Sequence, residues 1–142
     1  MHVIYSDAMV APAQGSSPSA AKPRPVVEAW IAQDPDIRIV PPKPVTIDDF
    51  ARAHERAFVE QVFALRIANG FGTRSSDVNK SLPYTTGAML TAAQIALTQK
   101  TAVAAPVSGF HHARWNEAAA YCTFNGLIVT AMALRAEHPT EY

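Results

Sequence analysis

The chain has 142 residues, of which 49% are hydrophobic, which is enough for one compact domain with its own core but too short for two. Twelve basic and twelve acidic residues give a formal net charge of zero, so nucleic-acid binding is disfavoured as a main function. The single cysteine, Cys122, excludes an internal disulfide and fits a reducing compartment. No segment resembles a signal sequence or a membrane span, so we expect a cytoplasmic protein without membrane association.

The first quarter of the chain predicts a strand, a long loop, a helix and a second strand. Val3-Ile4-Tyr5 is a short β-prone segment, and the Pro-, Ser- and Ala-rich residues 11–25 are typical of a loop. Pro25 favours a helix start, and apolar residues at helical spacing continue to about Asp34. Residues 37–40 alternate, are mostly β-branched and stop at two prolines, which predicts a strand.

The middle of the chain predicts helices separated by one long loop. Thr46 and Asp49 form the pattern of a capping box, so a helix should begin there, either as one bent helix or as two short ones that separate near His54. Asn69-Gly70 predicts a left-handed helix stop. Residues 70–83 predict a long loop, and residues 86–99, rich in alanine, predict a helix.

The last third predicts a strand and a nearly all-apolar helix. Residues 101–106 are compatible with a strand buried on both faces, and residues 125–137 form a helix with almost no polar side. That helix must be buried on most sides or expose a surface meant for something else. The alternation predicts an α/β fold, a partial parallel sheet with helices on both faces and right-handed crossovers. The sheet should be incomplete, and the open edge predicts self-association.

A histidine pair, His111-His112, follows the last expected strand. Open α/β sheets usually place their chemistry at the carboxyl ends of strands. A pair of histidines alone is weak evidence, because one of two adjacent side chains is often structural. Its context is more specific: Ser-Gly-Phe-His-His-Ala at 108–113 is followed by Glu117-Ala118 and by Tyr-Cys-Thr-Phe-Asn at 121–125.

These blocks, at this separation, resemble the Gly-His-His-Ala and Gly-Phe-Cys-x-x-Asn blocks of the histone deacetylase family. That family comprises zinc amidohydrolases and includes acetylpolyamine deacetylases. Weaker similarity is present in residues 3–7, 44–59 and 86–93. The resemblance covers residues 1–142, but it corresponds only to the N-terminal half of the family's domain, so it implies an incomplete three-layer arginase/deacetylase-like fold.

The resemblance implies a role for each matching residue. His111 and His112 would be the catalytic proton-transfer pair, not metal ligands. Gly109, Phe110 and Tyr121 would contact the substrate, an acetylated amine or acetyl-lysine. Gly109 would let the backbone approach closely, and Tyr121 would replace the Phe that lines the acyl-lysine channel.

Two departures from the family concern the substrate channel and the metal. Ala120 stands where the second block has Gly. The family holds zinc with an Asp-x-His and a later Asp, but no Asp-x-His occurs in this chain. A catalytic zinc needs three well-placed ligands, so we predict that no zinc binds to this chain alone. A C-terminal half or a partner chain would have to supply the ligands.

Two other functions remain open on the residues alone. The first is a non-catalytic binding module, or pseudoenzyme, of the same fold. The second is a Cys-His hydrolase that uses Cys122 with His111 or His112, although Cys122 lies in an apolar segment and is more typical of an inert core thiol. His54 is more typical of a structural histidine than of a catalytic one. Glu117 is either a hydrogen-bonding partner in the histidine loop or a solvated charge.

Overall fold

A small parallel sheet joins the two ends of the chain, with two strands from the first third and one from the last. The computed structural model describes residues 1–138. Its strands are β1 (His2–Ile4), β2 (Arg38–Val40) and β3 (Val103–Ala104), in the order β2-β1-β3, and both pairings are parallel. Val3 and Ile4 of β1 are fully buried because β1 is the middle strand. The predicted α/β class with a parallel sheet is confirmed. β3 has two residues, fewer than the predicted segment 101–106, and both are half-buried where burial on both faces was expected.

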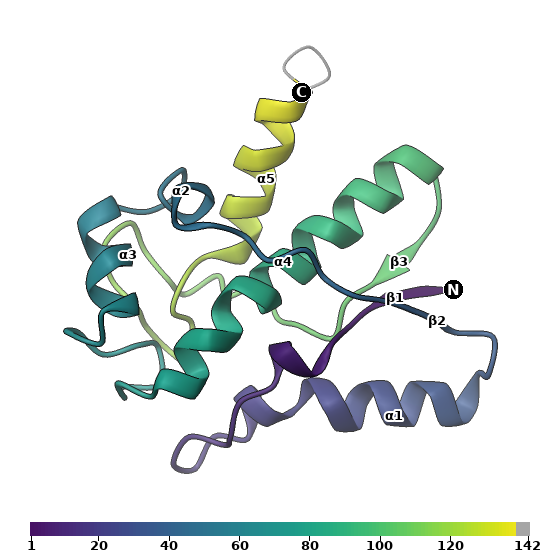
Figure 1. Cartoon of the computed structure of the whole chain (residues 1–142), viewed down its shortest axis with the longest axis horizontal. Coiled ribbons are helices and arrows are strands. Elements are labelled where there is room, and N and C mark those ends of the chain that lie inside the picture. The colour runs from purple at the N-terminus through teal and green to yellow at the C-terminus, as the bar shows by residue number, and fades with distance from the viewer. Residues whose placement is uncertain (139–142) are drawn as a thin grey trace.

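Five α-helices surround the sheet in residues 1–138. They are α1 (Pro23–Gln33), α2 (Ile47–Phe50), α3 (Arg56–Phe63), α4 (Ser76–Gln99) and α5 (Gly126–Glu137). In Figure 1, α1 and the second half of α4 lie on opposite sides of the strands, and α5 crosses α4 away from the sheet. Two short 3₁₀ turns, η1 (Asp7–Met9) and η2 (Ser19–Ala21), lie in the connection from β1 to α1. In the described part of the chain, no helix is long and apolar enough to cross a bilayer.

Helix α4 begins ahead of Pro83, so the prediction of a loop over residues 70–83 is wrong for its second half. The Ser75 hydroxyl accepts a hydrogen bond from the Val78 N–H at 3.3 Å, and Asp77 lies in the first turn, where a negative charge is favourable. Pro83 is tolerated inside the helix, although a proline cannot donate a backbone hydrogen bond. Its carbonyl accepts from the Val45 N–H at 3.1 Å, which ties the extended segment before α2 to α4.

The expected helix over residues 46–69 is two short helices, and they separate at His54 as predicted. The predicted left-handed stop at Gly70 is wrong. Helix α3 ends at Phe63, and the left-handed residue is Leu65 with φ +58°. Position 70 requires glycine for a different reason, because a Cβ there would collide with the backbone of Cys122. The glycine therefore allows this segment to pack closely against the segment before α5, and it does not cap a helix.

Two clusters of apolar side chains form the core. The first joins the sheet to α4 through Ile4, Met9 and Ala88. The second lies among α2, α3 and α5 and is aromatic, with Phe50, Phe58 and Phe124 at its centre. The segment that carries the histidine pair runs from the first cluster to the second.

Helix α5 exposes one apolar face. It packs against α4 through Val129 and Ala133, which are buried. Leu127, Ile128 and Met132 on another side are 51%, 48% and 41% exposed. Of the two outcomes expected for this helix, exposure of an apolar surface is the one observed.

Candidate active site

The histidine pair occupies the two central positions of a turn. The chain leaves β3 at Ala104 and reaches Phe110, whose φ of +55° is left-handed, and the Ala113 N–H then donates to the Phe110 carbonyl at 3.3 Å. His111 and His112 are exposed, and their ring centroids are 4.1 Å apart with the planes tilted by 38°.

A buried histidine holds this turn from behind. His54 is 1% exposed, and its Nδ1 lies 2.8 Å from the Arg114 carbonyl and 3.2 Å from the Trp115 carbonyl. Its Nε2 accepts from the Asn125 N–H at 2.8 Å. Because Nε2 accepts and Nδ1 faces carbonyls, the Nδ1–H tautomer satisfies every contact. His54 is thus a structural histidine, as the sequence suggested, and it joins the histidine turn to the start of α5.

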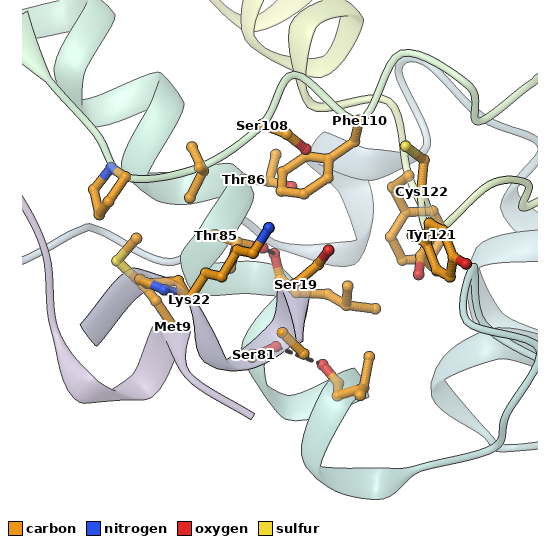
Figure 2. A pocket seen from close by; sticks show the side chains of 18 of the residues that line it. Met9, Ser19, Lys22, Ser81, Thr85, Thr86, Ser108, Phe110, Tyr121 and Cys122 are labelled. Atoms are coloured by element: carbon orange, nitrogen blue, oxygen red, sulfur yellow. Dashed lines mark hydrogen bonds between the residues drawn. The ribbon is translucent and has the colours of Figure 1, made fainter. Parts of the chain in front are cut away.

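A cavity of ≈ 570 Å³ opens beside the histidine pair. Its walls come from the end of η2, the first turns of α1, the first half of α4, the loop after β3 and the segment before α5 (Figure 2). Most of the lining side chains are apolar. The polar and aromatic ones include Ser19, Lys22, Trp30, Phe71, Thr86, Ser108, Phe110, His111, His112 and Tyr121.

Of the five residues predicted to act at a site, four line this cavity: His111, His112, Phe110 and Tyr121. Gly109 does not. Its carbonyl accepts from the Leu127 N–H at 3.3 Å, and a Cβ would lie 2.6 Å from the Leu127 Cδ1. Gly109 therefore allows the first turn of α5 to approach the loop, and its assignment to substrate binding stays a prediction.

Tyr121 sits on a strained two-residue turn at the rim. The Cys122 N–H donates to the Ala119 carbonyl at 2.8 Å, and both central residues are left-handed, with φ +47° at Ala120 and +65° at Tyr121. Such a turn favours glycine or asparagine at these positions. The Tyr121 ring lies 5.7 Å from that of Phe71, and both line the cavity. Two aromatic rings from distant segments thus form one wall.

Cys122 and Glu117 have ordinary surroundings. Cys122 is buried at the cavity wall, and its thiol donates to the Ala120 carbonyl at 3.5 Å; within residues 1–138 it makes no contact with a charged side chain that would activate it. Glu117 pairs with Arg114 at 3.2 Å on the surface. Neither geometry favours a Cys-His hydrolase.

The far side of the cavity was not foreseen from the sequence. The sequence predicts a loop over residues 11–25, yet Ser19 and Lys22 of this segment line the cavity, together with Met9 before it and Trp30 after it. Figure 2 shows Met9, Ser19 and Lys22 at the same cavity as Ser108 and Phe110. The one available signal is Lys22, a cation directly before a proline-rich helix start. The sequence alone does not show that this segment and the loop after β3 line the same space.

Residues 1–138 do not fit a zinc site. Among them, no three His, Cys, Asp or Glu side chains are close enough together to hold a metal ion. His111 and His112 are adjacent but have no third ligand beside them in this part of the chain.

The fold and the site define an α/β protein with a histidine pair beside a largely apolar cavity. A family model described as the histone deacetylase domain matches residues 21–141. This match covers most of the chain, and the protein belongs to the histone deacetylase family. A search of curated proteins gives no match. The family relationship suggests zinc in related proteins.

Proposed function

We propose that this chain provides the proton-transfer pair and the substrate cavity of a zinc-dependent deacetylase. The substrate would be an acetylated amine or acetyl-lysine, and the protein would act in the cytoplasm. The observation that carries the proposal is the family match over residues 21–141 together with two exposed, adjacent imidazoles beside a mostly apolar cavity.

The chain's own residues can handle the protons of amide hydrolysis. A neutral imidazole of the pair accepts a proton from the attacking water, and an imidazolium then donates a proton to the amine nitrogen as the C–N bond breaks. Phe71, Tyr121 and Phe110 would contact the acyl amide and exclude water from it. The metal ligands would come from a further segment or a partner chain, because residues 1–138 bring none together.

A second candidate is a binding module of the same fold without catalytic activity. The same cavity favours it, since acyl-amide binding needs only the aromatic walls and the polar groups at their ends. The two candidates differ in what the histidines do: only an enzyme needs them to transfer protons.

The test compares hydrolysis and binding in the same samples. The protein purified from its source, with any chain that accompanies it, should hydrolyse an acetyl-lysine peptide in a zinc-dependent manner. The His111→Ala/His112→Ala variant should lose at least a hundredfold in rate, the usual range for acid–base groups being about 10²–10⁴. Asn116→Ala, an exposed neighbour outside the cavity, should retain full activity.

Two results would decide against the enzyme. Binding of the peptide without zinc-dependent hydrolysis would favour the binding module. Unchanged hydrolysis in the double histidine variant would contradict the proposed proton transfer. For the recombinant 142-residue chain alone, we predict no stoichiometric zinc, and elemental analysis showing one zinc per chain would contradict that prediction.

A further inference from the structure

The described residues that line the cavity include a cation but no anion. Lys22 is the cation, and none of these residues is Asp or Glu. The local field therefore favours negative ligand groups and repels cations. The family resemblance does not distinguish acyl amides that carry a negative group from those that carry a positive one, but this charge distribution does.

Lys22 is exposed, and among residues 1–138 it has no partner for its charge. Asp7 in η1 is engaged elsewhere, by the Tyr5 hydroxyl at 2.6 Å and by Arg24 at 3.1 Å. In residues 1–138, Lys22 makes no side-chain hydrogen bond or ion pair, and Figure 2 shows its side chain extending into the cavity. An ammonium with three free donors is thus directed at a space that a ligand could occupy.

The backbone N–H groups at the start of α1 do not form a second anion site. Pro23 and Pro25, two of the first three residues of the helix, have no N–H to donate. A ligand anion would be held by the Lys22 ammonium, and not by a row of backbone amides. The hydroxyls of Ser108 and Thr86 also line the cavity, and neither side chain makes a hydrogen bond in the described structure.

The rest of the wall suits an alkyl chain. Val26 and Trp30 of α1 line the cavity, and so do Pro106 and Phe110 of the loop that carries the histidines. A ligand that spans the cavity would place an amide near the histidines, an apolar chain in the middle and its far end at Lys22.

We propose that Lys22 makes this cavity selective for acyl amides whose amine portion ends in a carboxylate, over neutral amides and over cationic polyamine amides. This inference rests on the proposed function, because it assumes that the acyl amide lies beside His111 and His112. The selectivity comes from a charge-assisted hydrogen bond between Lys22 Nζ and the carboxylate, in a cavity that offers a cation no carboxylate partner.

Three acetamides of equal chain length test it. 4-Acetamidobutanoate, N-butylacetamide and N-(4-aminobutyl)acetamide differ only in a negative, neutral or positive end. Titrations of the 142-residue chain followed by ¹H–¹⁵N NMR should give an affinity about tenfold higher for the anion than for the neutral amide, with the cation weakest. Lys22→Gln should remove that tenfold preference and leave the neutral amide unchanged. Lys100→Gln, an exposed lysine outside the cavity, should keep it.

Each other outcome overturns a specific claim. Equal affinity for the three amides, or a preference that survives Lys22→Gln, overturns the selectivity while the proposed acyl-amide site stands. Pentanoate is the reference for charge without an amide. If pentanoate binds through Lys22 and no amide binds better than it, the acyl-amide site falls and only anion binding at Lys22 remains. If none of the four ligands binds, both claims fall.

Discussion

His54 connects three segments that are far apart in the sequence. Its ring contacts the carbonyls of Arg114 and Trp115 on one side and the Asn125 N–H on the other. Burial lowers the pKa of His54 below its usual 6.5, while the hydrogen bonds to the carbonyls of Trp115 and Arg114 act in the opposite direction. The neutral ring is the form that the fold needs, because a protonated Nε2 cannot accept the Asn125 N–H.

His54 should make stability fall in acid. Its pKa is lower in the folded state than the value of 6.5 expected when unfolded, so the unfolded chain binds more protons in the window below pH 6.5. The contribution of neutral His54 is therefore complete above that pH and is lost as the pH falls from 6.5 through the lower pKa of the folded state. The free energy of unfolding, measured by urea titration between pH 5 and 8, should decline by at most about 1.4 kcal/mol per pH unit from this group. The His54→Gln variant should be less stable at pH 8, and its free energy of unfolding should depend less on pH below 6.5. An unchanged pH dependence would contradict the assignment of this effect to His54.

Ala120 is strained in the turn before Cys122. Its φ of +47° is left-handed, a conformation that costs a residue with a Cβ about 1–2 kcal/mol. Ala120→Gly should therefore raise the free energy of unfolding by about 1 kcal/mol, somewhat offset by the larger backbone entropy of unfolded glycine. Ala119→Gly is the matched control, because Ala119 is in the same turn without a positive φ and should lose stability. A destabilised Ala120→Gly would show that the turn relaxes around alanine.

At the scale of elements, Asn125 links α5 to the histidine turn. Its Oδ1 caps the helix by accepting from the Ile128 N–H at 3.2 Å, and its Nδ2 donates to the Ala113 carbonyl at 3.3 Å. The Asn125 side chain thus connects the start of α5 to the turn that carries His111 and His112, alongside the contacts of His54. Gly109 extends the same contact, since its carbonyl accepts from Leu127 in the first turn of the helix.

Two substitutions at Asn125 separate these roles. Asn125→Ala removes both contacts and should cost about 1 kcal/mol from the lost cap alone. Asn125→Asp keeps a capping oxygen but replaces the donor to Ala113 with an acceptor, so most stability should remain while the histidine turn loosens. Broadened or shifted NMR signals of the His111 and His112 rings in Asn125→Asp, with little change in unfolding free energy, would support this. Unchanged ring signals would mean that His54 holds the turn unaided.

At the scale of the whole molecule, the described residues include two features that favour association, open sheet edges and an exposed apolar helix face. β2 and β3 are edge strands of the sheet, and Ile39 of β2 is 42% exposed. The apolar face of α5, Leu127, Ile128 and Met132, lies on another part of the molecule. Large exposed apolar patches mark association surfaces, so the self-association predicted for this chain should involve the α5 face.

Self-association should depend on the α5 face. Met132→Lys places a charge on this face and should shift the isolated chain toward the monomer by a factor of ten or more in dissociation constant, about 1.4 kcal/mol. Ala29→Lys adds the same charge at an exposed site on α1 and should change nothing. Sedimentation velocity over a range of concentrations gives both values. A wild-type chain that is monomeric throughout would contradict the prediction.

The sequence by itself determined the class of the fold, the parallel strands, the break at His54 and the histidine pair, because these follow from local spacing, capping and short motifs. Tertiary structure alone decided the rest. Ser75 is a local cap for residues 76–83, but the Val45 N–H that binds the Pro83 carbonyl comes from a distant segment. Lys22 lies at the site because the segment before α1 and the loop after β3 line the same cavity. Contacts between such segments depend on the packing of residues distant in the chain, and no local pattern records them.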